Sequence, residues 1–121
     1  MPKILIIDDD PNFRSIYKDI CEKHKWDVIL ANNGQAGLEA VKKNQPDVIL
    51  LDMLMPVMGG MDFMHAFDYH NQAHKPKIIV LTNSKVPAET SGMVKRLGAS
   101  SYQIKSALSP NDLAELIKTY L

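Results

Sequence analysis

The sequence of 121 residues is poor in cysteine, in excess charge and in long apolar runs, and each shortage argues against a class of protein. The single cysteine, Cys21, cannot form an internal disulfide, which argues against a disulfide-stapled secreted domain. The 14 basic and 14 acidic residues cancel, so the chain has no electrostatic footprint for nucleic acid or lipid headgroups. No apolar run approaches the length of a membrane span and no signal peptide follows Met1, so we expect a cytoplasmic protein.

The length indicates one domain over residues 1–121, large enough to bury a core without disulfide or metal staples. The chain shows no internal repeat, low-complexity tract or interdomain linker, and we expect it to end with its last helix, without an output domain.

Short apolar stretches alternate with amphipathic ones along the whole chain. The apolar stretches predict strands over residues 3–7, 26–31, 48–51, 77–81 and 101–104. The stretches with helical spacing predict helices over residues 11–24, from the turn at 32–34 to about 44, over 61–67 and 87–98, and from residue 109 onward. Five strand and helix units joined by short loops predict an α/β fold, with a five-stranded parallel sheet and helices on both faces.

Polar side chains follow four of the predicted strands, at the point where each strand ends. Asp8 and Asp9 follow the first strand, Asp52 the third, Thr82 the fourth and Lys105 the fifth. Because the carboxyl ends of parallel strands meet at one edge of a sheet, where ligands bind in open α/β sheets, we expect these groups to converge there.

Five short motifs carry a resemblance to a known family. They are Ile7-Asp8-Asp9-Asp10-Pro11, Leu51-Asp52-Met53-Leu54-Met55-Pro56, Gly59-Gly60, Leu81-Thr82 and Lys105. In this order and near this spacing, they resemble the receiver domain of bacterial two-component response regulators, in the single-domain form typified by the chemotaxis regulator. The resemblance covers essentially the whole chain, and it implies a flavodoxin-like sheet with strand order 2-1-3-4-5.

The resemblance implies that Asp52 accepts a phosphoryl group from a phosphohistidine on a sensor histidine kinase or phosphotransfer protein. A divalent cation, Mg²⁺ or Mn²⁺, would neutralise charge beside the acceptor, since such ions prefer oxygen ligands. Asp9, Asp52 and the backbone carbonyl of Leu54 would be its direct ligands, and Asp8 would act mainly through water.

The resemblance also implies that Thr82, Asn83 and Lys105 bind the phosphoryl group. Thr82 would then move toward it, and Tyr102 would swing inward as the second part of a switch. The face formed by the fourth helix, fifth strand and fifth helix would change shape and be read by a downstream effector, an output domain or a second copy of the chain. Neither nucleic acid nor membrane is expected as a direct partner.

Most of these residues also have a plainer interpretation. Asp8 and Asp9 are common residue types for helix capping, although capping accounts for one aspartate and not for three. A threonine such as Thr82 is frequent at strand ends, and a lone lysine such as Lys105 is usually solvated. Tyr102 fits equally a core aromatic with its hydroxyl at the surface.

Three positions depart from the family pattern. Lys105 precedes Ser106 rather than proline, and a cis bond before a residue other than proline costs roughly 2.5 to 4 kcal/mol, which favours a trans bond here. Asn83 replaces the usual small residue after the threonine and can narrow the approach to the site. Leu54 is apolar and cannot orient an attacking water, which predicts slow self-dephosphorylation.

These departures leave competing functions open. A receiver fold that takes no phosphate and acts as a protein-interaction scaffold is the alternative to a phosphoacceptor. A phosphohydrolase would need an acid or base two residues past the nucleophile, where Leu54 stands, so we do not expect an enzyme.

Overall fold

The computed structural model describes residues 1–83 and 87–121. It contains a parallel sheet of five strands in the order β2-β1-β3-β4-β5, which confirms the predicted fold class and strand order. The strands are β1 (Lys3–Ile7), β2 (Asp27–Ala31), β3 (Val48–Asp52), β4 (Lys77–Thr82) and β5 (Ser101–Ile104).

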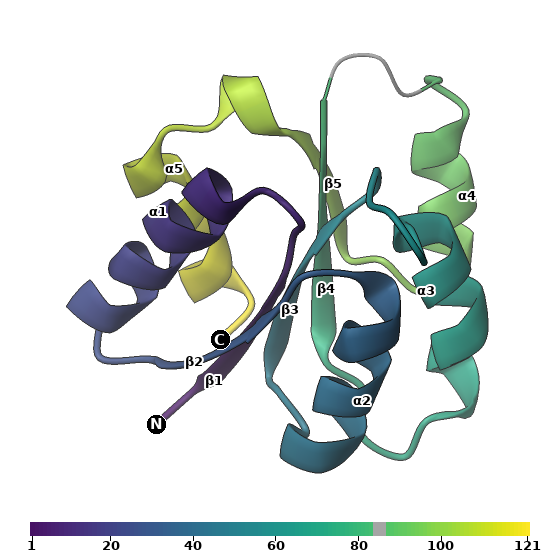
Figure 1. Ribbon diagram of the computed structural model, residues 1–121, viewed down its shortest axis with the longest axis horizontal. Coiled ribbons are helices and arrows are strands. Elements are labelled where there is room, and N and C mark those ends of the chain that lie inside the picture. The colour runs from purple at the N-terminus through teal and green to yellow at the C-terminus, as the bar shows by residue number, and fades with distance from the viewer. Residues whose placement is uncertain (84–86) are drawn as a thin grey trace.

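Helices cover both faces of the sheet (Figure 1). The helices are α1 (Pro11–Lys23), α2 (Gly34–Asn44), α3 (Gly60–Phe67), α4 (Thr90–Arg96) and α5 (Pro110–Thr119), with short 3-10 turns η1 (Tyr69–Asn71) and η2 (Lys105–Ala107). Helices α1 and α5 lie on one face and α2, α3 and α4 on the other (Figure 1). Within the described ranges, none of the helices is both long and apolar enough to cross a membrane.

The central strands are apolar on both sides because each side faces a layer of helices. Alternate residues of β1, β3 and β4 therefore contribute to two separate cores. The core under α1 and α5 takes Ile4, Ile6, Val48, Leu50, Ile79 and Leu81 from the sheet. The core under α2, α3 and α4 takes Leu5, Ile7, Ile49, Leu51, Ile78 and Val80. Strand β2 is less buried and lies at the edge of the sheet, as its mixed composition predicts.

Most element boundaries agree with those expected from the sequence to within one or two residues, and α4 is the exception. The predicted helix over 87–98 is wrong at its start, because α4 begins at Thr90. The residues before it form turns instead, in which Thr90 N–H donates to the Pro87 carbonyl at 3.0 Å and Ser91 N–H to the Ala88 carbonyl at 3.3 Å. Residues 84–86 lie outside the described part of the chain.

The register of the sheet determines which residues lie side by side where the strands end. Ile7 is paired with Leu51, so Asp8 and Asp52 follow at the same level on adjacent strands. Farther along the sheet, Thr82 is paired with Ile104, the last residue of β5, so Lys105 follows directly after that strand. The polar residues at the carboxyl ends of β1, β3, β4 and β5 therefore share one edge of the sheet.

Candidate functional site

Three carboxylates meet at the carboxyl edge of the sheet. One oxygen from each of Asp8, Asp9 and Asp52 lies within 4.8 Å of the other two. Asp8 and Asp52 are buried, with 2% and 6% of their surface exposed, whereas Asp9 is exposed. Three carboxylate oxygens at this spacing fit a hard divalent cation such as Mg²⁺, which prefers oxygen ligands and usually keeps several waters.

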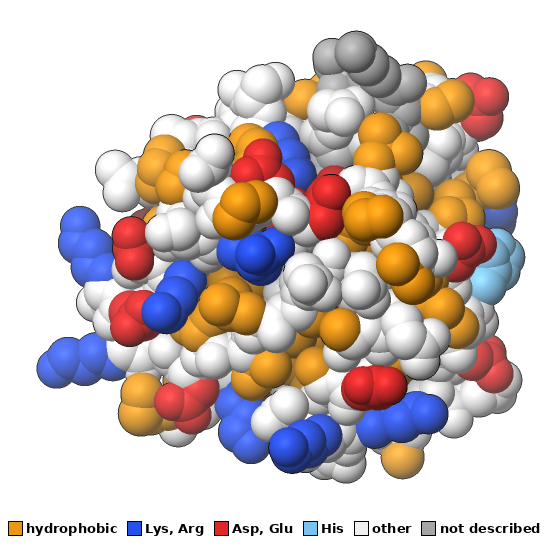
Figure 2. Space-filling model, in the orientation of Figure 1, with side chains coloured by type: hydrophobic (Ala, Val, Ile, Leu, Met, Phe, Trp, Pro, Cys, Tyr) orange, Lys and Arg blue, Asp and Glu red, His pale blue; other side chains and the backbone are white. Residues whose placement is uncertain are grey.

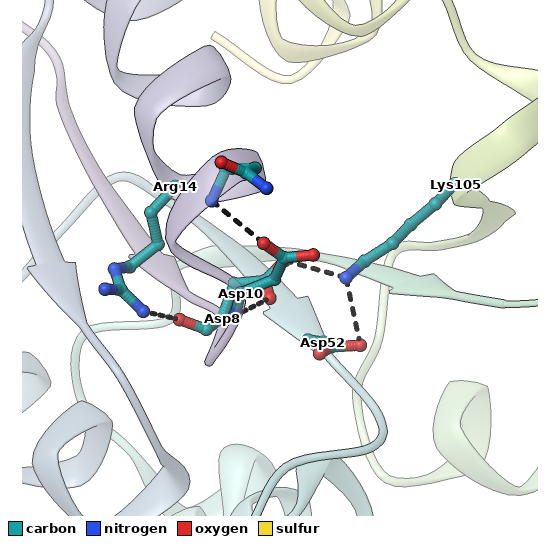
Figure 3. Close-up of polar contacts among 6 residues, drawn as sticks. Asp8, Asp10, Arg14, Asp52 and Lys105 are labelled. Atoms are coloured by element: carbon teal, nitrogen blue, oxygen red, sulfur yellow. Dashed lines mark hydrogen bonds and ion pairs between the residues drawn. The ribbon is translucent and has the colours of Figure 1, made fainter.

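Lys105 points toward Asp8 and Asp52 from the end of β5 and completes the cluster (Figure 3). Its ammonium is 2.8 Å from Oδ2 of Asp8 and 3.4 Å from Oδ1 of Asp52. The lysine side chain is only 11% exposed, so these ion pairs are partly shielded from water. The lysine reaches the site although Ser106 follows it, and the described chain contains no cis peptide bond.

The backbone after β1 is fixed by polar contacts that hold Asp8 in place (Figure 3). Oδ1 of Asp8 accepts from the backbone N–H of Asp10 at 2.9 Å, and Arg14 donates to the Asp8 carbonyl at 2.8 Å. Asp10 in turn caps α1, because its Oδ1 accepts from the Asn12 N–H at 2.8 Å. Of the three consecutive aspartates, the capping role thus belongs to Asp10.

Burial is the main cause that raises the pKa of Asp52, from its ordinary value of 3.8 to about 7. The charge of Asp8 raises this pKa further, and Lys105 and a hydrogen bond from the backbone of Leu54 lower it. The site therefore holds more negative charge than it can easily accommodate, and a bound cation would relieve the excess.

Thr82, the last residue of β4, and Asn83 after it lie beside the cluster along the sheet, because Asp52 is paired with Leu81 of β4. Thr82 is buried, and its hydroxyl donates to the Asn83 carbonyl at 3.2 Å. The Asn83 side chain is exposed. Tyr102 is half-buried on edge strand β5, where it is paired with Val80 and packs against the core under α2, α3 and α4. The phosphoryl-binding and switch roles of these residues stay predictions.

The loop after β3 forms the open side of the site. It borders a shallow depression of about 560 Å³ whose lining includes Asp9, Leu54, Met55, Pro56 and Asp62. Leu54 exposes 54% of its surface there. On the face shown in Figure 2, acidic and basic side chains are interspersed, and apolar ones lie between them.

Gly60 lets α3 begin close against the end of β3. A Cβ atom there would lie 2.6 Å from the Asp52 carbonyl oxygen and 2.9 Å from the Met53 Cα. Because both are backbone atoms that cannot easily move, glycine at position 60 allows α3 to approach the end of β3.

Two residues near the site were not singled out by the sequence. Arg14 binds the carbonyl of Asp8, and the ring of Phe13 faces the Lys105 ammonium. Helical spacing places Phe13 on the buried side of α1 but does not indicate which side chain it contacts. No sequence signal identifies either contact, since each joins groups brought together by the fold.

The sheet order and the carboxylate cluster at its edge are the features that the resemblance to a receiver domain implies. Comparison with known proteins agrees with that resemblance. The family model for the response regulator receiver domain matches residues 4–118. The chain therefore belongs to the receiver domain family, as its motifs indicated.

Individual proteins are similar to this chain over different shares of their own length. Protein PilH of Pseudomonas aeruginosa is 33% identical over 120 residues, which cover 98% of this chain and 94% of PilH. The transcriptional regulatory protein CpxR of Escherichia coli is 35% identical over 82 residues, which cover 68% of this chain but only 34% of CpxR. Among solved structures, chemotaxis protein CheY4 of Vibrio cholerae is 27% identical with a TM-score of 0.87, and the match covers 100% of this chain and 99% of that one.

Proposed function

We propose that this chain is a phosphoacceptor receiver domain that takes a phosphoryl group from a histidine kinase or phosphotransfer protein onto Asp52. The observation that carries the proposal is the meeting of Asp8, Asp9 and Asp52 within 4.8 Å, with the Lys105 ammonium against two of them. Three carboxylates held this close repel one another when ionised, and a cation with the Lys105 ammonium would offset that repulsion.

The proposed reaction is phosphoryl transfer from nitrogen to oxygen. A carboxylate oxygen of Asp52 forms a bond to phosphorus while the bond from phosphorus to the donor histidine breaks, and that imidazole nitrogen keeps the electron pair and takes a proton. Asp52 has to be ionised to attack, so the same cation charge that binds the phosphoryl group also favours the reactive form of the acceptor.

Asp9, Asp52 and the Leu54 carbonyl are the proposed ligands of Mg²⁺, or of Mn²⁺ in its place, with Asp8 contributing through water. The exposure of Asp9 supports this assignment, since Mg²⁺ keeps part of its water shell when it binds protein carboxylates. When bound, the ion would neutralise charge on the phosphoryl oxygens.

Lys105 is proposed to pair with a phosphoryl oxygen, and Thr82 and Asn83 to complete the binding of the group. The Thr82 hydroxyl now donates to the Asn83 carbonyl, a local bond that it can exchange for a phosphoryl oxygen. Such a change beside β5 would reach Tyr102, which packs against the same core as Val94 of α4.

We infer that this movement alters the face formed by α4, β5 and α5, and that an effector, an output domain or a second copy of the chain reads the change. Regulatory names among the relatives, such as that of the transcriptional regulatory protein CpxR, support a signalling role over an enzymatic one. Slow self-dephosphorylation, predicted from Leu54, belongs to the same proposal.

The proposal is tested by NMR, by adding Mg²⁺ and beryllofluoride, a mimic of the phosphoryl group, to the protein. We expect shifts of the resonances of Asp52, Thr82 and Tyr102 that disappear in Asp52→Asn. Asp62→Asn is the matched control, because Asp62 borders the same depression but lies outside the carboxylate cluster. A spectrum that does not respond would favour the phosphate-independent scaffold instead.

A further inference from the structure

An aromatic ring closes the side of the Lys105 ammonium that the carboxylates leave open. The Nζ atom lies 4.4 Å from the centroid of the Phe13 ring, within the distance at which a cation is attracted by the ring face. The same atom contacts Asp8 and Asp52. The ammonium is thus held between two carboxylates and one aromatic face. These contacts explain why the end of a long, flexible side chain is shielded from water.

Phe13 is itself held firmly. It lies in the first turn of α1, where Asp10 caps the helix and the neighbouring Arg14 is bonded to the Asp8 carbonyl. Its ring centroid is 5.6 Å from that of Tyr17, one helical turn later, in a tilted arrangement favourable to aromatic pairs. The position of the ring is therefore coupled to the backbone that carries Asp8.

The backbone beyond Lys105 offers little comparable support. Lys105 opens the short turn η2, and both residues after it, Ser106 and Ala107, are exposed. Among the described residues, the contact that the ammonium makes outside the acidic cluster is with Phe13 of α1. A small cavity of about 110 Å³, bordered by Phe13, Lys105 and Leu108, lies between this loop and α1.

We propose that Phe13 is a positioning residue, which holds the Lys105 ammonium at the acidic site through its ring face. This role rests on the proposed function, because the ammonium that Phe13 holds is the group proposed to pair with the phosphoryl oxygens. In this role Phe13 acts through the lysine, which its ring contacts at the Nζ atom. Its ring restricts the lysine to one side of the site and keeps water from competing for the ammonium.

The contact is tested first in the unsubstituted chain, by NMR with labelled lysine. The ring current of Phe13 shifts the ε-methylene protons of Lys105 upfield of those of the exposed lysines, and the Lys105 resonance is assigned by its loss in Lys105→Met. An ε-methylene resonance among those of the exposed lysines would overturn the proposal. This measurement needs no phosphoryl mimic, so its outcome is separate from the fate of the proposed function.

The positioning role is tested with Phe13→Leu, which keeps apolar bulk, and Phe13→Tyr, which keeps the ring. We expect Phe13→Leu to weaken Mg²⁺-dependent beryllofluoride binding by roughly threefold to tenfold, in keeping with the usual strength of a cation over a ring. Phe13→Tyr should bind within about twofold of the unsubstituted chain, because the ring face is retained. Equal losses in both variants would overturn the role.

A double substitution separates positioning from a general structural effect. In the Lys105→Met background, Phe13→Leu should cause no further loss of beryllofluoride binding, because the cation that it positions is absent. The same loss in both backgrounds would show that Phe13 merely supports the fold and would overturn the proposal. If the unsubstituted chain binds no beryllofluoride, the proposed function fails, and the Lys105 resonance still decides whether Phe13 holds the lysine.

Discussion

The Lys105 ammonium lies closer to Asp8, at 2.8 Å, than to Asp52, at 3.4 Å. The lysine is thus anchored by the aspartate that is not the proposed acceptor, and it remains within reach of the one that is. A phosphoryl group arriving on Asp52 would meet an ammonium already in place, so little reorganisation is required at that moment.

The raised pKa of Asp52 predicts that the protein loses stability as the pH rises. A carboxyl whose folded pKa is about 7, above its ordinary 3.8, binds its proton more tightly in the folded state. Its contribution is present at low pH and is lost as the pH rises from about 4 to about 7. In metal-free buffer, Asp52→Asn should therefore be more stable than the unsubstituted chain by about 1 to 3 kcal/mol at pH 8, and by much less at pH 4.

Urea unfolding across this pH range measures the difference, with Asp62→Asn as the control for loss of an exposed carboxylate. Parallel stability curves for Asp52→Asn and the unsubstituted chain would contradict the raised pKa.

Removing the lysine should change metal and phosphoryl binding in opposite directions. The Lys105 ammonium competes with a cation for Asp8 and Asp52, so Lys105→Met should bind Mg²⁺ roughly threefold to tenfold more tightly. The same variant should bind beryllofluoride at least about tenfold more weakly, because a charged hydrogen-bond donor to the anion is lost. Titrations of both ligands check the prediction, and changes of the same sign would contradict it. Lys118→Met, which alters an exposed lysine, is the control.

Asp9→Asn should weaken Mg²⁺ binding without harming the fold. Asp9 is exposed, and no described hydrogen bond or ion pair of its side chain stabilises the chain, so its carboxylate is free for an ion. We expect at least about tenfold weaker Mg²⁺ binding, with unfolding unchanged to within about 0.5 kcal/mol. Calorimetric titration with Mg²⁺ tests this, and Asp62→Asn should bind as the unsubstituted chain does.

Gly98 should tolerate no side chain. Its φ is +119°, and a Cβ atom there would clash with Cγ of Tyr69, so Gly98→Ala should destabilise the protein by about 1 to 3 kcal/mol. Gly92→Ala is the matched control, since among the described residues a Cβ there meets only the flexible end of Arg96 at 3.4 Å. That control should gain up to about 1 kcal/mol from better helix propensity. Equal effects of the two substitutions on thermal unfolding would contradict this account of the turn after α4.

Much of the fold could be predicted because strands buried on both faces are uniformly apolar, as in Ile4–Ile7, and proline and glycine mark their ends. The order of the strands came from the resemblance, since periodicity carries no information on which strands are neighbours. The start of α4 was missed because Pro87 is a favourable first residue for a helix, yet here it begins a turn.

The part of the site that could be predicted is the part whose position follows from the parallel sheet alone. Residues that follow neighbouring strands, such as Asp8 and Asp52, must lie at the same edge. The contact between Phe13 and Lys105 was beyond prediction, because it depends on how a helix and a loop far apart in the chain pack together.

The most direct test of the central claim is intact-mass spectrometry after incubation with acetyl phosphate and Mg²⁺, followed by mapping of the modified residue. The account predicts the gain of one phosphoryl group on Asp52, absent when Mg²⁺ is chelated and absent in Asp52→Asn. An unmodified chain, or a phosphoryl group that persists in Asp52→Asn, would contradict it.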